Sequence, residues 1–455
     1  MSVTESGVAE APRPRRGRPP SVGLAERRRE ELTDAAFTVF AEQGYEHASV
    51  ADIAKRAGMG QGTLYRYVEG KRELLDLVFD RCVDELMTAI GPDRVVDVTA
   101  SGDLAAAEEM VEGVAARLFG LLDSRPDILK VVMVQSGTVD EELRFRIQGL
   151  YQTFDSMMGR ALGHARELGW IVTRTEHPEA ETVHLGRLLP ALGVPGMMMA
   201  LTDGDDPERR EAYVRSAVRM SASGILSGDA REALPPLAPS EEGDPVEPGA
   251  EVPEPVTGRS AGRSAELLDA AIAEFVEKGY AAVGVREITE RAGVSHGTFY
   301  NYFDSKRHML SVLVERNREA VLGRVDAVVA DPPAATVEAL QAAVFALNRD
   351  VLQGIAERLD EFRFLALEVP GVDVEAFDTY LLLYREAASR FEAILGGARE
   401  AGLLHGSLGV GDIAEVWLGY MLGTAAAMVS DVDVTSPAES ARVVTNLLLG
   451  GARTL

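Results

Sequence analysis

Residues 57–72 read AGMGQGTLYRYVEGKR, and residues 292–307 read AGVSHGTFYNYFDSKR. The two stretches lie 235 residues apart and share one ungapped pattern, Ala-Gly-x-x-x-Gly-Thr-Leu/Phe-Tyr-x-Tyr-Val/Phe-x-x-Lys-Arg. A weaker match continues downstream, where Ala165-Arg166-Glu167 corresponds to Ala398-Arg399-Glu400 at an offset of 233. A period of this length is a complete domain rather than a solenoid repeat. The chain is therefore predicted to contain two related units joined head to tail.

Each repeat is predicted to fold as a helix-turn-helix. In the first copy, Leu32, Ala36 and Phe40 fall at helical spacing and form an apolar face. Gly44 follows as a helix end, where a left-handed residue is favoured. Gly58 then supplies the tight turn between the second and third helices. The second copy has the same residue types at the same positions.

The third helix of each copy carries side chains suited to DNA. Amides and Arg pair with base edges, whereas hydroxyls and Lys contact phosphates. A plain three-helix unit with a polar face is the alternative interpretation, and the repetition of the whole pattern argues against it. The expected DNA contacts are Gln61, Thr63, Tyr65, Arg66, Tyr67 and Lys71, and, in the second copy, His296, Thr298, Tyr300, Asn301, Tyr302 and Lys306.

These residues resemble the TetR family of bacterial transcriptional regulators. The resemblance is specific in residues 32–75 and 267–310 and architectural beyond them. It implies an N-terminal helix-turn-helix, a C-terminal helical domain that binds a small effector, pairing through the last two helices, and usually repression. The chain departs from the family pattern because it carries two such motifs.

The resulting fold class is all-α, with two TetR-like units. The expected boundaries are a disordered basic arm (1–22), a first DNA-binding domain (23–90), a first effector and dimerisation domain (91–228), an acidic Pro-rich linker (229–262), a second DNA-binding domain (263–320) and a second effector and dimerisation domain (321–455). Proline and like charges extend such a linker.

The basic arm contains Arg16-Gly17-Arg18-Pro19, which resembles the core of an AT-hook. Arginines enter the narrow, negative minor groove of A·T tracts. Two interpretations stay open here: a minor-groove contact through Arg16 and Arg18, or a solvated tail.

The effector is expected to be a small apolar or amphipathic molecule. Aromatic residues and methionines on apolar helical stretches are the candidates for its pocket, and core packing is the competing interpretation for each of them. The candidates are Met133, Tyr151, Phe154, Trp170, Phe364, Tyr384 and Trp417.

Composition excludes several other classes of protein. The net charge of −26 argues against a non-specific nucleic-acid coat. Cys82 is the single cysteine, so neither a disulfide framework nor a cysteine zinc site can form. The sequence has no His-Glu-x-x-His motif and nothing in it looks catalytic, so no enzyme activity, cofactor or metal is expected. No apolar run reaches the length of a membrane helix, and a cytoplasmic protein is expected.

The duplication suggests an assembly in which the two halves pair within one chain and present both reading helices to double-stranded DNA. Gln61 is matched by His296, and Arg66 by Asn301, so an asymmetric operator is expected. Two alternatives remain: a homodimer of whole chains, and a protein in which one half reads DNA while the other is a sensor or partner-binding module.

Overall fold

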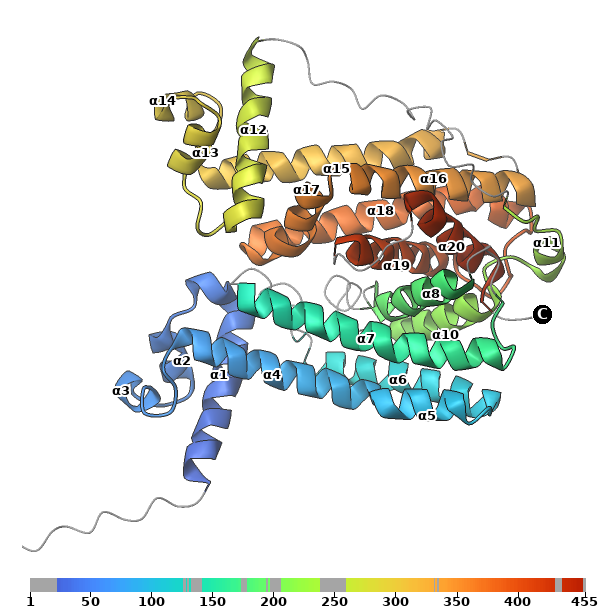
Figure 1. Ribbon diagram of the computed structural model, residues 1–455, viewed down its shortest axis with the longest axis horizontal. Coiled ribbons are helices and arrows are strands. Elements are labelled where there is room, and N and C mark those ends of the chain that lie inside the picture. The colour runs from blue at the N-terminus through green and yellow to red at the C-terminus, as the bar shows by residue number, and fades with distance from the viewer. Residues whose placement is uncertain are drawn as a thin grey trace, which may run out of the picture. The chain divides into compact units, whose positions relative to one another are not determined.

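The computed structural model describes residues 23–125, 128, 131, 141–172, 178–193, 195–196, 206–237, 259–330, 332–333, 335–429 and 436–452. These residues form helices joined by turns, apart from isolated bridges such as that between Leu226 and Leu404. The expected all-α class is thus confirmed (Figure 1). By internal contacts the chain divides into two compact units, Met1–Val39 with Ala48–Val78, and Phe40–His47 with Phe79–Leu455.

The first helix-turn-helix consists of α1 (Leu24–His47), α2 (Val50–Arg56), α3 (Gln61–Leu64) and the start of α4 (Lys71–Ile90). Leu32, Ile53 and Leu64 are fully buried and form its core, as apolar residues at helical spacing should. The Ser49 side chain accepts a hydrogen bond from the backbone N–H of Asp52 and so caps α2. Gly58 turns the chain into α3 with φ of 66°.

The second helix-turn-helix repeats this design in α12 (Arg259–Lys278), α13 (Val285–Arg291), α14 (His296–Phe299) and the start of α15 (Lys306–Ala330). Leu267, Phe275, Ile288 and Phe299 are fully buried in its core. Gly293 takes φ of 65°, almost the value of its counterpart in the first copy. The local sequence therefore builds the same turn twice.

Two further sets of helices follow the two motifs. After the first come α5 (Pro92–Ala100), α6 (Leu104–Ser124), α7 (Glu141–Glu167), α8 (Pro178–Ala191) and α10 (Pro207–Ser223). After the second come α16 (Val337–Glu357), α17 (Leu359–Arg363), the π-helix η3 (Phe364–Glu368), the 3₁₀ turn η4 (Val369–Gly371), α18 (Val374–Glu400), α19 (Val410–Val429) and α20 (Pro437–Gly450). The helices α6 and α16, and likewise α7 and α18, begin and end 233 residues apart, so the duplication extends over whole units.

The copies differ in the helix that leaves each motif. In the first half α4 ends at Ile90, because Gly91 adopts φ of 64° and Pro92 starts a new helix. In the second half α15 continues without a break to Ala330. The first copy thus has a kink where the second has one straight helix.

The linker starts later than the sequence predicts. Residues 228–232 form the short helix α11 (Gly228–Glu232), and Ala230 is buried. The carbonyl oxygens of Pro235 and Leu237 accept hydrogen bonds from Gln341 (2.8 Å) and Arg442 (3.2 Å). Those bonds hold the start of the predicted linker against the second half. The basic arm, with Arg16 and Arg18, and residues 238–258 lie outside the described residues.

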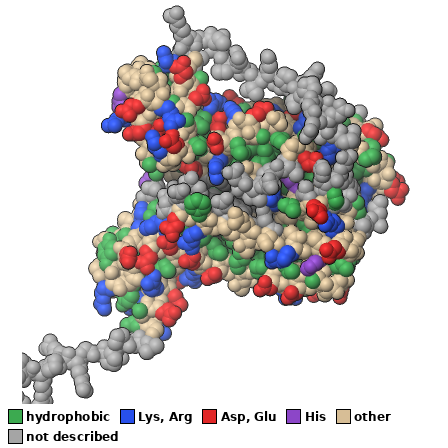
Figure 2. All heavy atoms as spheres, viewed as in Figure 1, with side chains coloured by type: hydrophobic (Ala, Val, Ile, Leu, Met, Phe, Trp, Pro, Cys, Tyr) green, Lys and Arg blue, Asp and Glu red, His purple; other side chains and the backbone are tan. Residues whose placement is uncertain are grey.

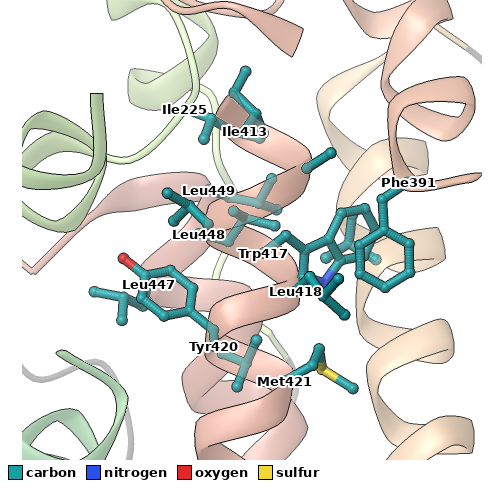
Figure 3. Packing of buried hydrophobic residues seen from close by; sticks show 14 of the residues in the cluster. Ile225, Phe391, Ile413, Trp417, Leu418, Tyr420, Met421, Leu447, Leu448 and Leu449 are labelled. Atoms are coloured by element: carbon teal, nitrogen blue, oxygen red, sulfur yellow. The ribbon is translucent and has the colours of Figure 1, made fainter. Parts of the chain in front are cut away.

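Helices from both halves meet in one hydrophobic core. The helices α8 and α10 pack against α19 and α20. Figure 3 shows Ile225, from the segment after α10, beside Ile413 and Leu449 of the second half. At Gly423 a Cβ atom would come within 2.5 Å of the Ala191 Cβ, so α8 and α19 approach closely.

The backbone segments that follow α10 and α20 exchange partners reciprocally. The N–H of Ile225 donates to the Leu448 carbonyl, and the N–H of Ala452 donates to the Ser221 carbonyl, both at 2.9 Å. A second pair joins these segments to the turns after α18 and α7: His405 N–H donates to Ile225 O (2.8 Å), and Val172 N–H donates to Ala452 O (2.7 Å). Each bond maps onto its partner when the halves are interchanged, which is the pattern of an isologous interface.

Candidate functional site

The helix α3 presents a polar surface above one buried anchor. Leu64 is fully buried, whereas the neighbouring Tyr65 side chain is 51% exposed. Gln61 and Arg66 are also exposed, and Tyr67 is half-buried with the Arg66 guanidinium 6.0 Å from its ring centroid. Gln61, Tyr65 and Arg66 are therefore open to solvent, whereas Thr63 is half-buried, and their contact with DNA stays a prediction.

The helix α14 repeats this exposure pattern. Phe299 is fully buried, Tyr300 is 50% exposed, and His296 and Asn301 are exposed. The His296 and Tyr300 rings lie 5.3 Å apart between centroids. The matched positions of the two helices thus have the same exposure, whereas the side chains His296 and Asn301 differ from Gln61 and Arg66.

The two reading helices begin differently. The Ser295 Oγ accepts from the Thr298 N–H (3.2 Å) and lies 2.8 Å from the Thr298 hydroxyl. At the matching position the first copy has Gly60, which offers no side-chain cap. The cap thus holds the Thr298 hydroxyl beside the Ser295 hydroxyl, a contact that Gly60 cannot make with Thr63.

Lys306 has an intramolecular role that its sequence position did not predict. Its ammonium group donates to the carbonyl oxygens of Tyr280 (2.8 Å) and Val283 (2.7 Å) and lies 4.1 Å from the centroid of the Tyr280 ring. Burial raises the pKa of Tyr280 to about 12, so this ring stays neutral. Lys306 thus holds the turn between α12 and α13 against the start of α15. Phosphate contact by Lys306, or by the half-buried Lys71, stays a prediction.

A buried carboxylate stabilises the second motif and was not anticipated. Glu274 is 4% exposed and accepts hydrogen bonds from Lys278 and Arg291, both at 2.6 Å. The hydrogen bond from Lys278, with that from Arg291, lowers the pKa of the Glu274 carboxyl below its usual range. The first copy has the buried Val39 at this position. A glutamate on an otherwise apolar helix face was the signal in the sequence.

Ion pairs join the second motif to the helices behind it. The Arg307 guanidinium binds both carboxylate oxygens of Asp373, at 2.5 and 3.0 Å. Arg316 contacts Asp269 of α12 at 3.3 Å and Glu361 of α17 at 3.1 Å. Such side chains hold a reading head at one angle to its effector domain.

Three candidate effector residues of the second half are buried in the core. Phe364 stacks on Phe275, with centroids 5.1 Å apart, inside the core of the second motif. Trp417 is fully buried, lies against the Phe391 ring with centroids 4.3 Å apart, and donates its indole N–H to the Asn348 side chain at 2.8 Å. The Tyr384 hydroxyl donates to the Glu415 carboxylate. Core packing explains these positions, and contact with an effector has no support from their geometry.

The first-half candidates are less completely described. Phe154 and Trp170 are half-buried, and Phe154 packs on a small cluster that includes Met110 and Met157. Met133 and the Tyr151 side chain lie outside the described residues. Effector contact by these four positions stays a prediction.

Among the described residues, two hollows can be compared with a ligand pocket. The one between α15, α16 and α17, lined by Arg324, Ile355 and Phe362, has a volume of about 20 Å³, room for about one water. The other is an open depression on α5 and α6 between Arg94, Glu109 and Arg117. Ligand pockets usually enclose about 300–1,000 Å³ and are mostly apolar. The first hollow is far smaller than this. The second has a volume of about 370 Å³, within this range, but it is open and lined mainly by charged side chains.

The described part of the chain contains no group of His, Cys, Asp and Glu arranged to hold a metal, and none of its helices is long and apolar enough to cross a membrane. Burial raises the pKa of the Cys82 thiol to about 12, which keeps it protonated and unreactive. Figure 2 shows acidic and basic side chains interspersed over the visible face, in keeping with the net charge of −26.

Comparison with known proteins gives consistent matches. The family described as "Bacterial regulatory proteins, tetR family" matches residues 32–78 and again 267–313. The HTH-type transcriptional repressor KstR2 of Rhodococcus jostii is 32% identical over 153 residues, which are 33% of this chain and 70% of KstR2. The fatty acid metabolism regulator protein of Bacillus subtilis is 27% identical over 141 residues, 31% of this chain and 69% of that protein.

Solved structures align with part of the chain. The fatty acid degradation regulator FadR from Bacillus halodurans aligns over 43% of this chain and 97% of its own, with 19% identity and a TM-score of 0.38. The likeness to KstR2 and the two separate family matches agree with the two exposed reading helices. The chain therefore belongs to the TetR family of bacterial transcriptional regulators, as a DNA-binding regulator built from two TetR-type units in tandem.

Proposed function

We propose that the protein is a ligand-responsive repressor whose two halves pair within one chain and bind an asymmetric operator. KstR2 is a repressor by name, which supports repression as the outcome. The regulator from Bacillus subtilis is named for fatty acid metabolism, which supports an apolar or amphipathic effector.

One observation carries the intrachain pairing. The four reciprocal backbone hydrogen bonds around Ile225 and Ala452 relate the first half to the second as two subunits of a dimer are related. Side-chain contacts accompany them: Ser221 with Tyr420 at 2.9 Å, and Ser216 with Asp412 at 2.6 Å. Because the surfaces of α8, α10, α19 and α20 are buried in contact with each other, they are not available to bind a second chain.

Two linked subunits can read two different half-sites. A helix-turn-helix dimer binds half-sites about 34–36 Å apart, one turn of DNA. Gln61 and Arg66 of one head are replaced by His296 and Asn301 in the other, so the bases preferred in the two half-sites differ. The operator is therefore expected to lack palindromic symmetry.

Mass in solution and DNA selection test this proposal together. Light scattering at low concentration should give one chain, 48.9 kDa. Sites selected from random DNA by the purified protein should contain two unlike half-sites. A particle of twice this mass, or a perfect palindrome among the selected sites, would replace the pseudodimer by a dimer of chains with four reading heads.

A further inference from the structure

We propose that the two helix-turn-helix motifs, the reading heads, use an exposed arginine for different parts of the DNA. Arg66 of the first head binds the edge of a guanine, whereas Arg286 of the second head binds a backbone phosphate. The inference rests on the proposed binding of DNA by both halves. Its basis is the chemistry at matched positions of the two motifs, each taken by itself.

Two pairs of matched positions, 235 residues apart, carry the difference. Ala51 in α2 corresponds to Arg286 in α13, and Arg66 after α3 corresponds to Asn301 after α14. All four residues are exposed. Each head therefore has one arginine at these positions, but the first has it beside its reading helix and the second has it on the preceding helix.

Arg66 is placed to read a base. It follows the helix that a helix-turn-helix inserts into the major groove, and it is exposed two residues after the buried anchor Leu64. A guanidinium donates two parallel hydrogen bonds to O6 and N7 of guanine, whereas an asparagine amide pairs with N6 and N7 of adenine. The base facing this position should therefore be guanine in the first half-site and, because of Asn301, adenine in the second.

Arg286 is placed to meet the backbone. It lies two residues before the buried Ile288, on roughly the opposite side of α13, and its side chain is 76% exposed. The helix α13 packs against α14 (Figure 1). In a helix-turn-helix the first helix crosses the DNA backbone while the second enters the groove. A guanidinium on the open side of α13 is therefore expected to contact phosphate.

The intramolecular partner of Arg286 can be exchanged for a phosphate. Its Nε lies 3.0 Å from the Glu290 carboxylate, which is 64% exposed. Glu287 is engaged elsewhere, because it accepts a hydrogen bond from the backbone N–H at the N-cap of α13 (3.0 Å). Exposed ion pairs contribute little stability, so a phosphate can replace Glu290. The first head has Ala51 and Lys55 at these two positions and cannot form such a pair.

Salt dependence of DNA binding tests the role of Arg286. With full-length protein and DNA selected by it from random sequences, Arg286→Ala should reduce the steepness of log K against log salt by about 0.9 and leave the selected bases unchanged. Arg215→Ala is the matched control, since Arg215 is 62% exposed and pairs with Glu211 at the same spacing, in α10. It should change neither quantity. An unchanged steepness in Arg286→Ala, or altered base selection, would overturn its assignment to phosphate.

Transplants from the second head into the first test the same difference in reverse. Arg66→Asn should change the base selected at one position of the first half-site from guanine to adenine and weaken binding to the original site about tenfold or more. Ala51→Arg should steepen the salt dependence by about 0.9 without changing any selected base. Retention of guanine by Arg66→Asn, or an unaltered salt dependence in Ala51→Arg, would overturn the proposal.

Selection by the wild-type protein separates these failures from failure of the proposed function. Two unlike half-sites together with no effect of the variants would overturn only the different use of the two arginines. A single half-site would mean that one half alone reads DNA, and would overturn both.

Discussion

Gly423 offers the sharpest test of pairing between the halves. It lies in α19 with α8 directly against it: an added Cβ would stand 2.5 Å from the Ala191 Cβ and 3.4 Å from the Arg187 carbonyl oxygen. Carbon atoms prefer separations of about 3.5–4.0 Å. Gly423→Ala therefore forces the two helices apart by about 1 Å or displaces Ala191 with its helix.

Two opposing energies decide the outcome. Overpacking of a close contact costs about 1–3 kcal/mol. Replacing a mid-helix glycine by alanine returns about 0.5–1 kcal/mol. The midpoints of these ranges, about 2 and about 0.75 kcal/mol, leave a net loss of about 1 kcal/mol, which weakens pairing by about 5–10-fold.

Binding to selected DNA measures this loss. Affinity for DNA with both half-sites should fall in Gly423→Ala, while affinity for a single half-site should not, because only simultaneous binding depends on pairing. Gly323→Ala is the matched control, since Gly323 is exposed in α15 and its Cβ would meet nothing within 4 Å. Equal two-site affinity in the two variants would refute the reasoning.

Three further predictions follow from single residues. Tyr65→Ala and Tyr300→Ala should each weaken only their own half-site, by about tenfold or more if each makes a specific contact; binding assays on single half-sites check this, and an effect from only one of them would mean that one half reads DNA. The ion pairs of Glu274 lower its pKa, so the charged carboxylate stabilises the folded state above the ordinary carboxyl pKa, and this stability is lost as pH falls through the lowered pKa. Glu274→Val, which introduces the residue of the first copy, should therefore make hydrogen exchange in α12–α14 less dependent on pH between about 5 and 3. Burial lowers the pKa of His184 to about 4, so about 3 kcal/mol of stability present above pH 6.5 should be lost as pH falls towards 4; His184→Gln should flatten the dependence of the unfolding midpoint on pH over that range, and an unchanged slope would contradict the assignment.

The fold and the exposed side of each reading helix could be predicted from the sequence. Apolar residues such as Leu64 and Phe299 at helical spacing, with glycines at the turns, specify local structure independently of the rest of the chain. Tyr65 and Tyr300 could be placed outward because the neighbouring anchor fixes the orientation of a short helix.

Contacts between distant segments could not be predicted in the same way. The exchange of backbone bonds around Ile225 and Ala452 uses amides that every residue carries, so it leaves no signature in the sequence. In the sequence Lys306 was interpreted as a phosphate ligand. Its partners in the structure are backbone carbonyls, which every residue carries, so the sequence could not reveal them. Trp417 and Phe364 look alike as core or pocket residues until their neighbours are known.

Fusion of two units changes which substitutions a dimer can accept. In a homodimer every substitution occurs twice, so a substitution that fills the interior of one effector domain also fills the interior of the other. In this chain Asn348 and Phe364 occur in one half, and Ala115 and Val131 stand at the matched positions of the other. The buried hydrogen bonds of Asn348 in the second half therefore place no constraint on the first half. The same reasoning applies to the reading heads, where His296 can specialise without altering Gln61. Covalent linkage keeps the two halves at high effective concentration whatever their sequences, so the two halves can differ at matched positions without losing their partner.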